Sequence, residues 1–276
     1  MTTIVREPLT GPAVWRGPDL EPADYLHELT PSEITEIERV RDDLTARDIG
    51  LGAIDPESVP LPGLEATIAG WLDRVENGVG FVVVRGLDID RWTELEAGLA
   101  YYAVGRQMGR PVKQNDRGHL LGHIRDPGKD IFTDQSARGY QVRIALPFHT
   151  DTSTDLLSLM CLRPAKEGGE SALAPLQTVY NEVLARRPDL IDTYYRPFNF
   201  DCRDEEHPDG GPFYTRVLAS VGTDGRFSLR HNSGYARSAA HRFDECPALT
   251  EQQDELLALV DELTQDPTIH VRVVLE

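Results

Sequence analysis

The stretch Leu146-Pro147-Phe148-His149-Thr150-Asp151 is followed, after four residues, by the apolar run Leu156-Leu157-Ser158-Leu159-Met160-Cys161-Leu162. A short apolar run of this length is typical of a buried β-strand. We therefore expect the strongest strand of the chain over residues 156–162. The apolar tripeptide before His149 places that histidine at a strand end that faces an interior.

Helices are predicted mainly upstream of this stretch. Thr30-Pro31-Ser32-Glu33 combines a helix-capping threonine, a proline in the first turn and a glutamate that reaches back to the cap. Apolar residues then recur at helical spacing over residues 34–44, and two more helices are expected over residues 64–76 and 92–108. Between these two, residues 80–86 predict a buried strand.

The rest of the chain predicts short strands and turns with a few helices. Helices are expected over residues 175–187 and from the capping box Thr250-Glu251-Gln252-Gln253 onward. Turns and short strands are expected over residues 197–231. Further strand-like pieces lie at residues 120–124, 141–146, 170–174 and 269–275.

This order of elements predicts a mixed, β-rich fold in which helices wrap a β core. Regular alternation of strand and helix is missing, so a doubly wound parallel sheet is disfavoured. We expect a single domain over residues 1–276. Its helical N-terminal part is expected at residues 1–79, and the β core with helical insertions at residues 80–276.

Composition narrows the classes of function. The net charge is −18, from 28 basic and 46 acidic residues, and a strongly acidic protein is poorly suited to bind nucleic acid. No run of 18 apolar residues predicts a membrane span, and the first residues lack the pattern of a secretory signal. The three cysteines form no Cys-x-x-Cys pair. Scattered thiols without a leader are typical of a reducing compartment, so we expect a cytoplasmic protein.

The triplet His149-Thr150-Asp151 is the candidate metal site. In an extended segment, residues two apart point to the same side, so an imidazole and a carboxylate can converge on one ion. They would supply two of the three ligands of the facial triad in non-haem iron(II) oxygenases. A structural histidine bonded to a neighbouring carboxylate is the alternative. The pattern also recurs by chance: His207-Pro208-Asp209 lies in an acidic stretch rich in glycine and proline, where we expect a solvated loop.

A longer, ordered set of motifs resembles one family. Between Gly80 and Ser171 the chain is similar to the taurine dioxygenase/TfdA-like family of iron(II)- and 2-oxoglutarate-dependent oxygenases. Each piece is weak alone, but the pieces occur in the family's order. They are residues 80–86 (GFVVVRG), 108–112 (MGRPV), 146–151 (LPFHTD), 159–165 (LMCLRPA) and 168–171 (GGES).

The resemblance implies a distorted double-stranded β-helix, or jelly roll, flanked by α-helices. It implies that His149 and Asp151 bind Fe(II), and that the hydroxyl of Ser171 binds a carboxylate of the cosubstrate 2-oxoglutarate. Gln114 and Asn115 fall where the family places groups on the substrate side, with ordinary loop amides as the alternative. The implied reaction oxidises an unactivated C–H bond of a small molecule and releases succinate and CO2.

The resemblance is incomplete at its C-terminal end. In the family, a second histidine ligand and an arginine that binds 2-oxoglutarate follow a late turn, which would begin where this chain ends at Leu275-Glu276. We therefore expect a jelly roll that lacks its last strands. Three downstream histidines, besides His207, are weak candidates for the third ligand: His231, His241 and His270. A truncated or degenerate non-catalytic relative that binds a small ligand or a partner is the alternative, and a cupin-like metal enzyme without 2-oxoglutarate is a third.

Overall fold

The computed structural model describes residues 3–115, 117–125, 144–151, 154–203 and 210–275. The chain forms two compact units. We call residues 5–112, 153–188 and 263–276 the N-terminal unit, and residues 1–4, 113–152 and 189–262 the motif unit, because it contains His149 and Asp151. Each unit is described separately. The expectation of one domain over residues 1–276 stays a prediction.

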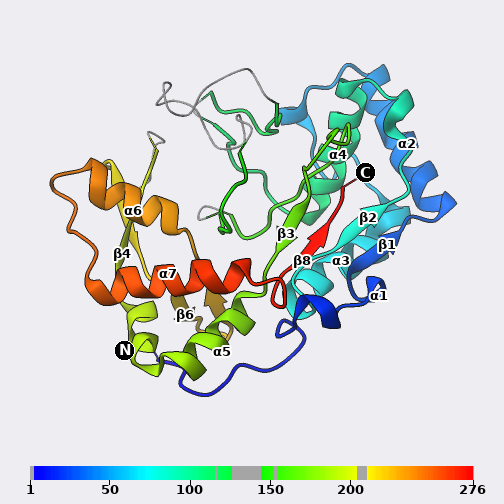
Figure 1. The fold of residues 1–276 in the computed structure, drawn as a ribbon. Coiled ribbons are helices and arrows are strands. Elements are labelled where there is room, and N and C mark those ends of the chain that lie inside the picture. The colour runs from blue at the N-terminus through cyan, green and yellow to red at the C-terminus, as the bar shows by residue number, and fades with distance from the viewer. Residues whose placement is uncertain (1–2, 116, 126–143, 152–153, 204–209, 276) are drawn as a thin grey trace. The chain divides into compact units, whose positions relative to one another are not determined.

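A pair of packed helices forms much of the N-terminal unit (Figure 1). Helix α2 (Pro31–Ala46) packs against α4 (Glu94–Met108). Thr30 caps α2: its hydroxyl accepts a hydrogen bond from the Glu33 N–H, and the Glu33 carboxylate accepts one from the Thr30 N–H at 2.7 Å. Thr93 and Glu96 make the same capping box at α4. Apolar residues at helical spacing, including Ile37 and Leu44, are buried between the helices and their neighbours.

Helix α3 (Glu65–Asn77) and α5 (Leu176–Arg186) complete the longer helices of this unit. The Thr178 hydroxyl on α5 donates to the Trp15 carbonyl at 2.8 Å, which ties α5 to the N-terminal segment. The helix α1 and the short 3-10 helices connect these elements: η1 (Gly17–Asp19), α1 (Pro22–Tyr25), η2 (Leu51–Ala53), η3 (Pro62–Leu64), η4 (Ile89–Arg91) and η6 (Pro188–Tyr195), which leads into the motif unit.

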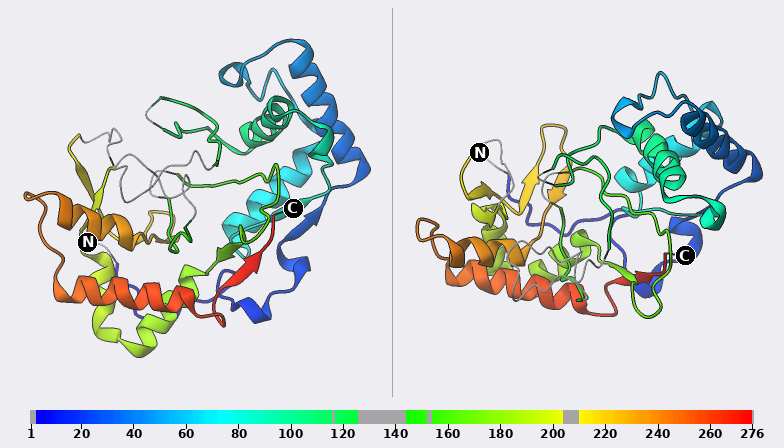
Figure 2. Two further views of the ribbon diagram at one scale, coloured as in Figure 1. Left: turned by 45° about the horizontal axis from the view of Figure 1, so that its top comes forward. Right: turned by 90° about the horizontal axis from the view of Figure 1, so that it is seen from above.

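Two small sheets belong to the N-terminal unit. Strand β1 (Leu26–Glu28) pairs in parallel with β2 (Val83–Arg85), and β3 (Ser171–Leu173) pairs antiparallel with β8 (Val271–Val273). Figures 1 and 2 show β3 and β8 side by side in every view. The register places Ser171 opposite Val273.

The motif unit contains two further antiparallel pairs and the remaining helices. Strand β4 (Phe198–Asp201) pairs with β5 (Phe213–Arg216), and β6 (Ala219–Val221) pairs with β7 (Phe227–Leu229). Helix α6 (Ser233–Arg242) packs on β4. Helix α7 (Glu251–Gln265) begins in this unit and buries Leu256, Leu257 and Val260.

The expected helices and several strands are confirmed. The helices predicted over residues 34–44, 64–76, 92–108, 175–187 and from Thr250 onward correspond to α2, α3, α4, α5 and α7. Strands lie within the segments expected at residues 80–86, 170–174 and 269–275, and short strands fill residues 197–231. Helix α6 was not anticipated. The strand at residues 80–86 is only partly buried, since Val84 is 38% exposed.

Three strand predictions differ from the structure. Residues 156–162 and 120–124 form no strand, and neither do residues 144–146, the part of 141–146 that the structure describes. Leu157 and Leu159 are exposed by 58% and 49%. An apolar run becomes a strand only when a neighbouring strand takes up its backbone hydrogen bonds, and no pairing with 156–162 exists among the described residues.

The mixed helix-and-strand class is confirmed, but its β-rich character is not. Within the described ranges the strands form four two-stranded sheets, and helices contribute more residues than strands. No continuous double-stranded β-helix is formed by this part of the chain. No helix of the described residues is both long and apolar enough to cross a membrane.

Candidate functional site

The imidazole of His149 is oriented by its own backbone. Its Nδ1 lies 2.7 Å from the carbonyl oxygen of Pro147, two residues earlier. A carbonyl only accepts, so Nδ1 must carry the proton. The lone pair of the neutral ring is then on Nε2. His149 is exposed. A ring nitrogen that donates to a backbone carbonyl while the other presents a lone pair is the usual arrangement of a metal-binding histidine.

Asp151 is also exposed. Its carboxylate forms no hydrogen bond or ion pair with any residue that the structure describes. The alternative, in which His149 is a structural histidine bonded to a nearby carboxylate, does not match this geometry. The ring of His149 bonds to a main-chain carbonyl, and both side chains present polar groups to solvent.

Thr150, between these two residues, is attached to His231 in the motif unit. The Thr150 N–H donates to the His231 carbonyl at 2.7 Å, and the His231 N–H donates to the Thr150 hydroxyl at 3.0 Å. These two bonds join segments that are 81 residues apart in sequence. The middle of the candidate motif is therefore fixed to His231, two residues before the start of α6.

The side chain of His231 is held by helix α7. It is 3% exposed, and its Nε2 lies 2.8 Å from Oδ1 of Asp261. The same carboxylate accepts from the Ser233 hydroxyl at 2.8 Å and from the Arg237 guanidinium at 2.9 Å. Burial opposes ionisation of Asp261, but the bonds from His231, Arg237 and Ser233 hold the pKa of this carboxyl below its usual value. Asp261 is therefore a charged anchor for His231.

The other histidines named as candidate ligands lie in different surroundings. His231 directs Nε2 to Asp261, while its buried Nδ1 has no hydrogen-bond partner among the described residues. His241 is exposed in the last turn of α6. His270 belongs to the N-terminal unit and is buried, with Nδ1 3.1 Å from the Thr264 carbonyl. His207-Pro208-Asp209 lies outside the described residues. Across residues that are described, no group of three His, Cys, Asp or Glu side chains could hold a metal.

Ser171 begins strand β3 of the N-terminal unit and is half-buried. Its neighbour Glu170 forms a 3.0 Å ion pair with Arg272 of β8, which lies opposite Ala172 in the register. The β3–β8 ladder therefore fixes the backbone at Ser171. The role expected for its hydroxyl stays a prediction.

Gln114 and Asn115 lie in a loop of the motif unit. The Gln114 N–H donates to the His119 carbonyl at 2.7 Å. The Asn115 side chain accepts from the Arg117 N–H at 3.1 Å and lies 3.1 Å from the His119 ring. Asparagine commonly stabilises turns in this way. The side chain of Asn115 thus shapes its own loop in this structure, and its expected substrate-side role, like that of Gln114, remains untested.

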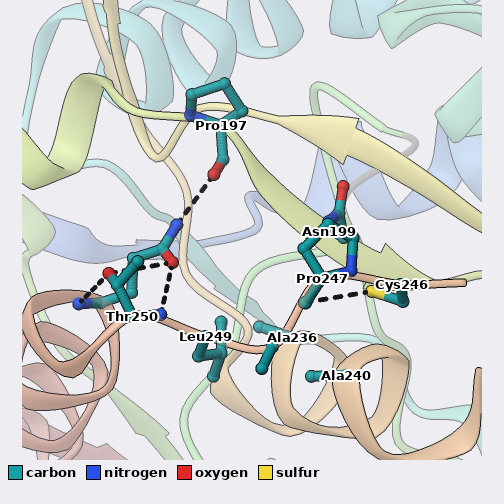
Figure 3. Close-up of a pocket in the computed structure, with 10 residues that line it drawn as sticks. Pro197, Asn199, Ala236, Ala240, Cys246, Pro247, Leu249 and Thr250 are labelled. Carbon is teal, nitrogen blue, oxygen red and sulfur yellow. Dashed lines mark hydrogen bonds between the residues drawn. The ribbon is translucent and has the colours of Figure 1, made fainter. Parts of the chain in front are cut away.

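A separate cavity of about 370 Å³ lies in the motif unit (Figure 3). Its polar groups bond to one another: Gln253 donates to the Pro197 carbonyl at 2.9 Å and accepts from the Thr250 N–H at 2.9 Å. Burial raises the pKa of the Cys246 thiol in its wall. Neither His149 nor Asp151 lines this cavity.

Comparison with known proteins connects this geometry to a family. Residues 43–276 match the family described as taurine catabolism dioxygenase TauD, TfdA family. The chain belongs to the TauD/TfdA family. The resemblance drawn from the motifs between Gly80 and Ser171 is thereby confirmed.

Two relatives illustrate the similarity to this TauD/TfdA chain. It is 30% identical over 279 residues to FR-33289 synthase of Streptomyces rubellomurinus (strain ATCC 31215), covering 100% of this chain and 81% of the relative. It is 29% identical over 259 residues to taurine hydroxylase-like protein SAT17 of Stachybotrys chartarum (strain CBS 109288 / IBT 7711), covering 88% of this chain and 63% of that protein.

TauD/TfdA enzymes are dioxygenases, and the donors found here fit a ferrous ion. Imidazole and carboxylate are the ligand types of non-haem iron(II) sites. His149 meets the requirement for a defined tautomer, since its Nδ1 bonds to Pro147. The sequence pattern predicted His149 and Asp151 as metal ligands, a prediction that remains untested, but it gave no sign of the contact between Thr150 and His231 or of the bond from His231 to Asp261. No local spacing could have linked them, because the contacts join distant parts of the chain.

Proposed function

We propose that this chain is an Fe(II)- and 2-oxoglutarate-dependent dioxygenase that oxidises an unactivated C–H bond of a small molecule. The observation that carries the proposal is the His149 ring, whose Nδ1 bonds to the Pro147 carbonyl at 2.7 Å, two residues before an exposed Asp151. Membership of the TauD/TfdA family supports the same reaction class.

His149 Nε2 and a carboxylate oxygen of Asp151 would hold the metal. When bound, iron and 2-oxoglutarate supply the oxidising chemistry: dioxygen is consumed, 2-oxoglutarate is converted to succinate and CO2, and one oxygen atom is available for the substrate. The chain's own contribution is orientation. The Pro147 carbonyl keeps the proton on Nδ1 of His149, so that the lone pair stays on the opposite nitrogen.

Other residues would bind the two organic molecules. We assign the hydroxyl of Ser171 to a carboxylate of 2-oxoglutarate, to which it can donate one hydrogen bond. Gln114 and Asn115 are proposed on the substrate side. For Asn115 this requires its side chain to move, because it now accepts hydrogen bonds from the N–H groups of Arg117 and His119.

The net charge and the cysteines of the whole chain support a class of substrate and a cellular compartment. The net charge of −18 supports a small-molecule substrate rather than nucleic acid or an anionic membrane surface. Three cysteines that form no disulfide, Cys161, Cys202 and Cys246, support a reducing, cytoplasmic location.

Anaerobic titration tests the proposal. Adding Fe(II) and then 2-oxoglutarate should produce the visible charge-transfer absorption of the chelate, and exposure to oxygen should yield succinate. His149→Ala should abolish the absorption. His123→Ala is the matched control, because His123 is an exposed histidine that is not among the candidate ligands and should leave the signal unchanged.

The outcome separates the proposal from its alternatives. Iron binding without 2-oxoglutarate consumption would favour a cupin-like metal site. If neither iron nor 2-oxoglutarate binds to the folded protein, the non-catalytic relative that binds a small ligand or a partner is the better description.

A further inference from the structure

A chain of hydrogen bonds leads from α7 to the residue between the two candidate ligands. Asp261 on α7 bonds to the His231 ring at 2.8 Å, and the main chain of His231 bonds twice to Thr150, at 2.7 Å and 3.0 Å. Every member of this chain lies in the motif unit. Its end is one residue from both His149 and Asp151.

The two bonds at Thr150 restrict different degrees of freedom. The N–H bond to the His231 carbonyl fixes the distance between the segments, and the hydroxyl bond from the His231 N–H adds a second point of attachment. With both hydrogen bonds in place, the backbone at Thr150 cannot rotate freely about either bond. Because each neighbour is joined to Thr150 through a planar peptide unit, fixing the backbone of Thr150 also restricts the backbone of His149 and Asp151.

The residue to which Thr150 is bonded, His231, is itself held firmly. His231 is only 3% exposed. Its ring bonds to the carboxylate of Asp261, which Ser233 and Arg237 also bind. Arg237 extends the network to Asp254 at 3.1 Å, which lies on the same face of α7, about two turns before Asp261. The attachment point of Thr150 is therefore supported by α7 rather than by a free loop.

We infer that His231 is a positioning residue. Through its two bonds to Thr150 it orients His149 and Asp151 toward the metal, and its bond to Asp261 anchors this segment to α7. The inference rests on the proposed function, since it assumes that these two residues bind metal. Outer groups that orient metal ligands commonly contribute a factor of about 10 to 100 in metal affinity.

The first test uses the protein without metal. Amide hydrogen exchange at residues 146–151 should be faster in Asp261→Ala than in the wild type, because His231 loses its anchor. Asp254→Ala is the matched control: it removes a carboxylate from the same helix and from Arg237, but leaves the Asp261–His231 bond. Unchanged exchange in Asp261→Ala, or equal acceleration in both variants, would overturn the inference.

The second test uses Mn(II) alone, followed by electron paramagnetic resonance. Thr150→Val keeps the shape of the side chain but removes the acceptor for the His231 N–H, and should weaken Mn(II) binding about tenfold. Thr150→Ser keeps the hydroxyl and should restore wild-type affinity. Equal affinity in Thr150→Val and the wild type, or failure of Thr150→Ser to restore it, would contradict the positioning role.

The two proposals fail in distinguishable ways. If the folded wild-type chain binds no Mn(II), the proposed metal site is wrong and the positioning inference falls with it. If the wild type binds Mn(II), His149→Ala abolishes binding and Thr150→Val does not weaken it, the proposed function stands and only the role of His231 is overturned.

Discussion

The guanidinium of Arg242 lies 2.8 Å and 3.1 Å from the two carboxylate oxygens of Asp201, which is fully buried on β4. Ser238 of α6 and the Arg203 N–H also donate to this carboxylate. Burial opposes ionisation of Asp201, but these donors hold its pKa below the usual value. The contact between α6 and β4 thus depends on a buried charge with several partners.

Arg242→Gln should therefore destabilise the chain. Removing Arg242 leaves the buried charge of Asp201 poorly compensated. For a fully buried ion pair this lowers the free energy of unfolding by about 3 kcal/mol, and we expect a smaller loss here because Arg242 is partly exposed. Urea denaturation measures the loss. Arg47→Gln is the control, since Arg47 and Asp43 form a 2.7 Å pair in which both side chains are 47% exposed, and should cost less than about 1 kcal/mol. Equal losses would contradict the role given to Asp201.

Glu33 should make stability depend on pH. Its side chain is buried, which disfavours the charged form, but bonds from Thr67, the Thr30 N–H and the Thr30 hydroxyl lower its pKa from 4.5 to about 2. A carboxyl whose pKa is lower in the folded chain contributes its full stabilisation of the folded state at pH values above its pKa in the unfolded chain. This contribution is lost as the pH falls from 4.5 through about 2.

Glu33→Gln measures this contribution. Since one pKa unit corresponds to about 1.4 kcal/mol, the variant should unfold more easily than the wild type by roughly 3 kcal/mol at pH 7. The two proteins should converge near pH 2. Glu57→Gln, at an exposed turn, should match the wild type at both pH values. A difference between Glu33→Gln and the wild type that stays constant with pH would refute the assignment.

The sequence predicted helix starts well because the signals are local. Thr30 and Glu33 lie three residues apart, so their reciprocal bonds could be expected from spacing alone, and the structure has both. The bond from Thr67 to Glu33 crosses 34 residues and has no local signal. Helix α6 was missed because its buried residues, Ser233, Ala236 and Ala239, are small and give only a weak apolar stripe.

The strand over residues 156–162 was wrong for a related reason. An apolar run reports that a segment would gain from burial, but not which segment covers it. Leu157 and Leu159 remain largely exposed. At the candidate site, spacing led to the prediction of His149 and Asp151 as metal ligands, and that prediction remains to be tested. The hydrogen bonds between Thr150 and His231, which join distant parts of the chain, became visible only in the folded chain.

Two glycines should respond to alanine in opposite directions. A Cβ at Gly17 would overlap the His270 carbonyl, and the Gly17 N–H donates to the Ile269 carbonyl at 3.1 Å, so this backbone contact cannot easily open. Gly17→Ala should cost about 1–3 kcal/mol. Gly70 is exposed within α3 with open space around it, so Gly70→Ala should stabilise by about 0.5–1 kcal/mol. Thermal denaturation of both variants checks the signs, and destabilisation by Gly70→Ala would contradict the exposed helix.

Asp151 provides the sharpest separation of a metal ligand from an ordinary surface carboxylate. Asp151→Asn keeps the size of the side chain and one carbonyl oxygen but removes the negative charge, which contributes much of the attraction for a divalent cation. An outer-shell partner alone commonly contributes about tenfold in metal affinity, so loss of a direct ligand's charge should weaken Mn(II) binding by about tenfold or more.

Asp155→Asn, four residues later and also exposed, should bind Mn(II) like the wild type. Calorimetric titration compares the three proteins. Because both substitutions remove one charge from a chain of net charge −18, a general electrostatic effect would weaken binding equally in both variants, and that result would argue against Asp151 as a ligand.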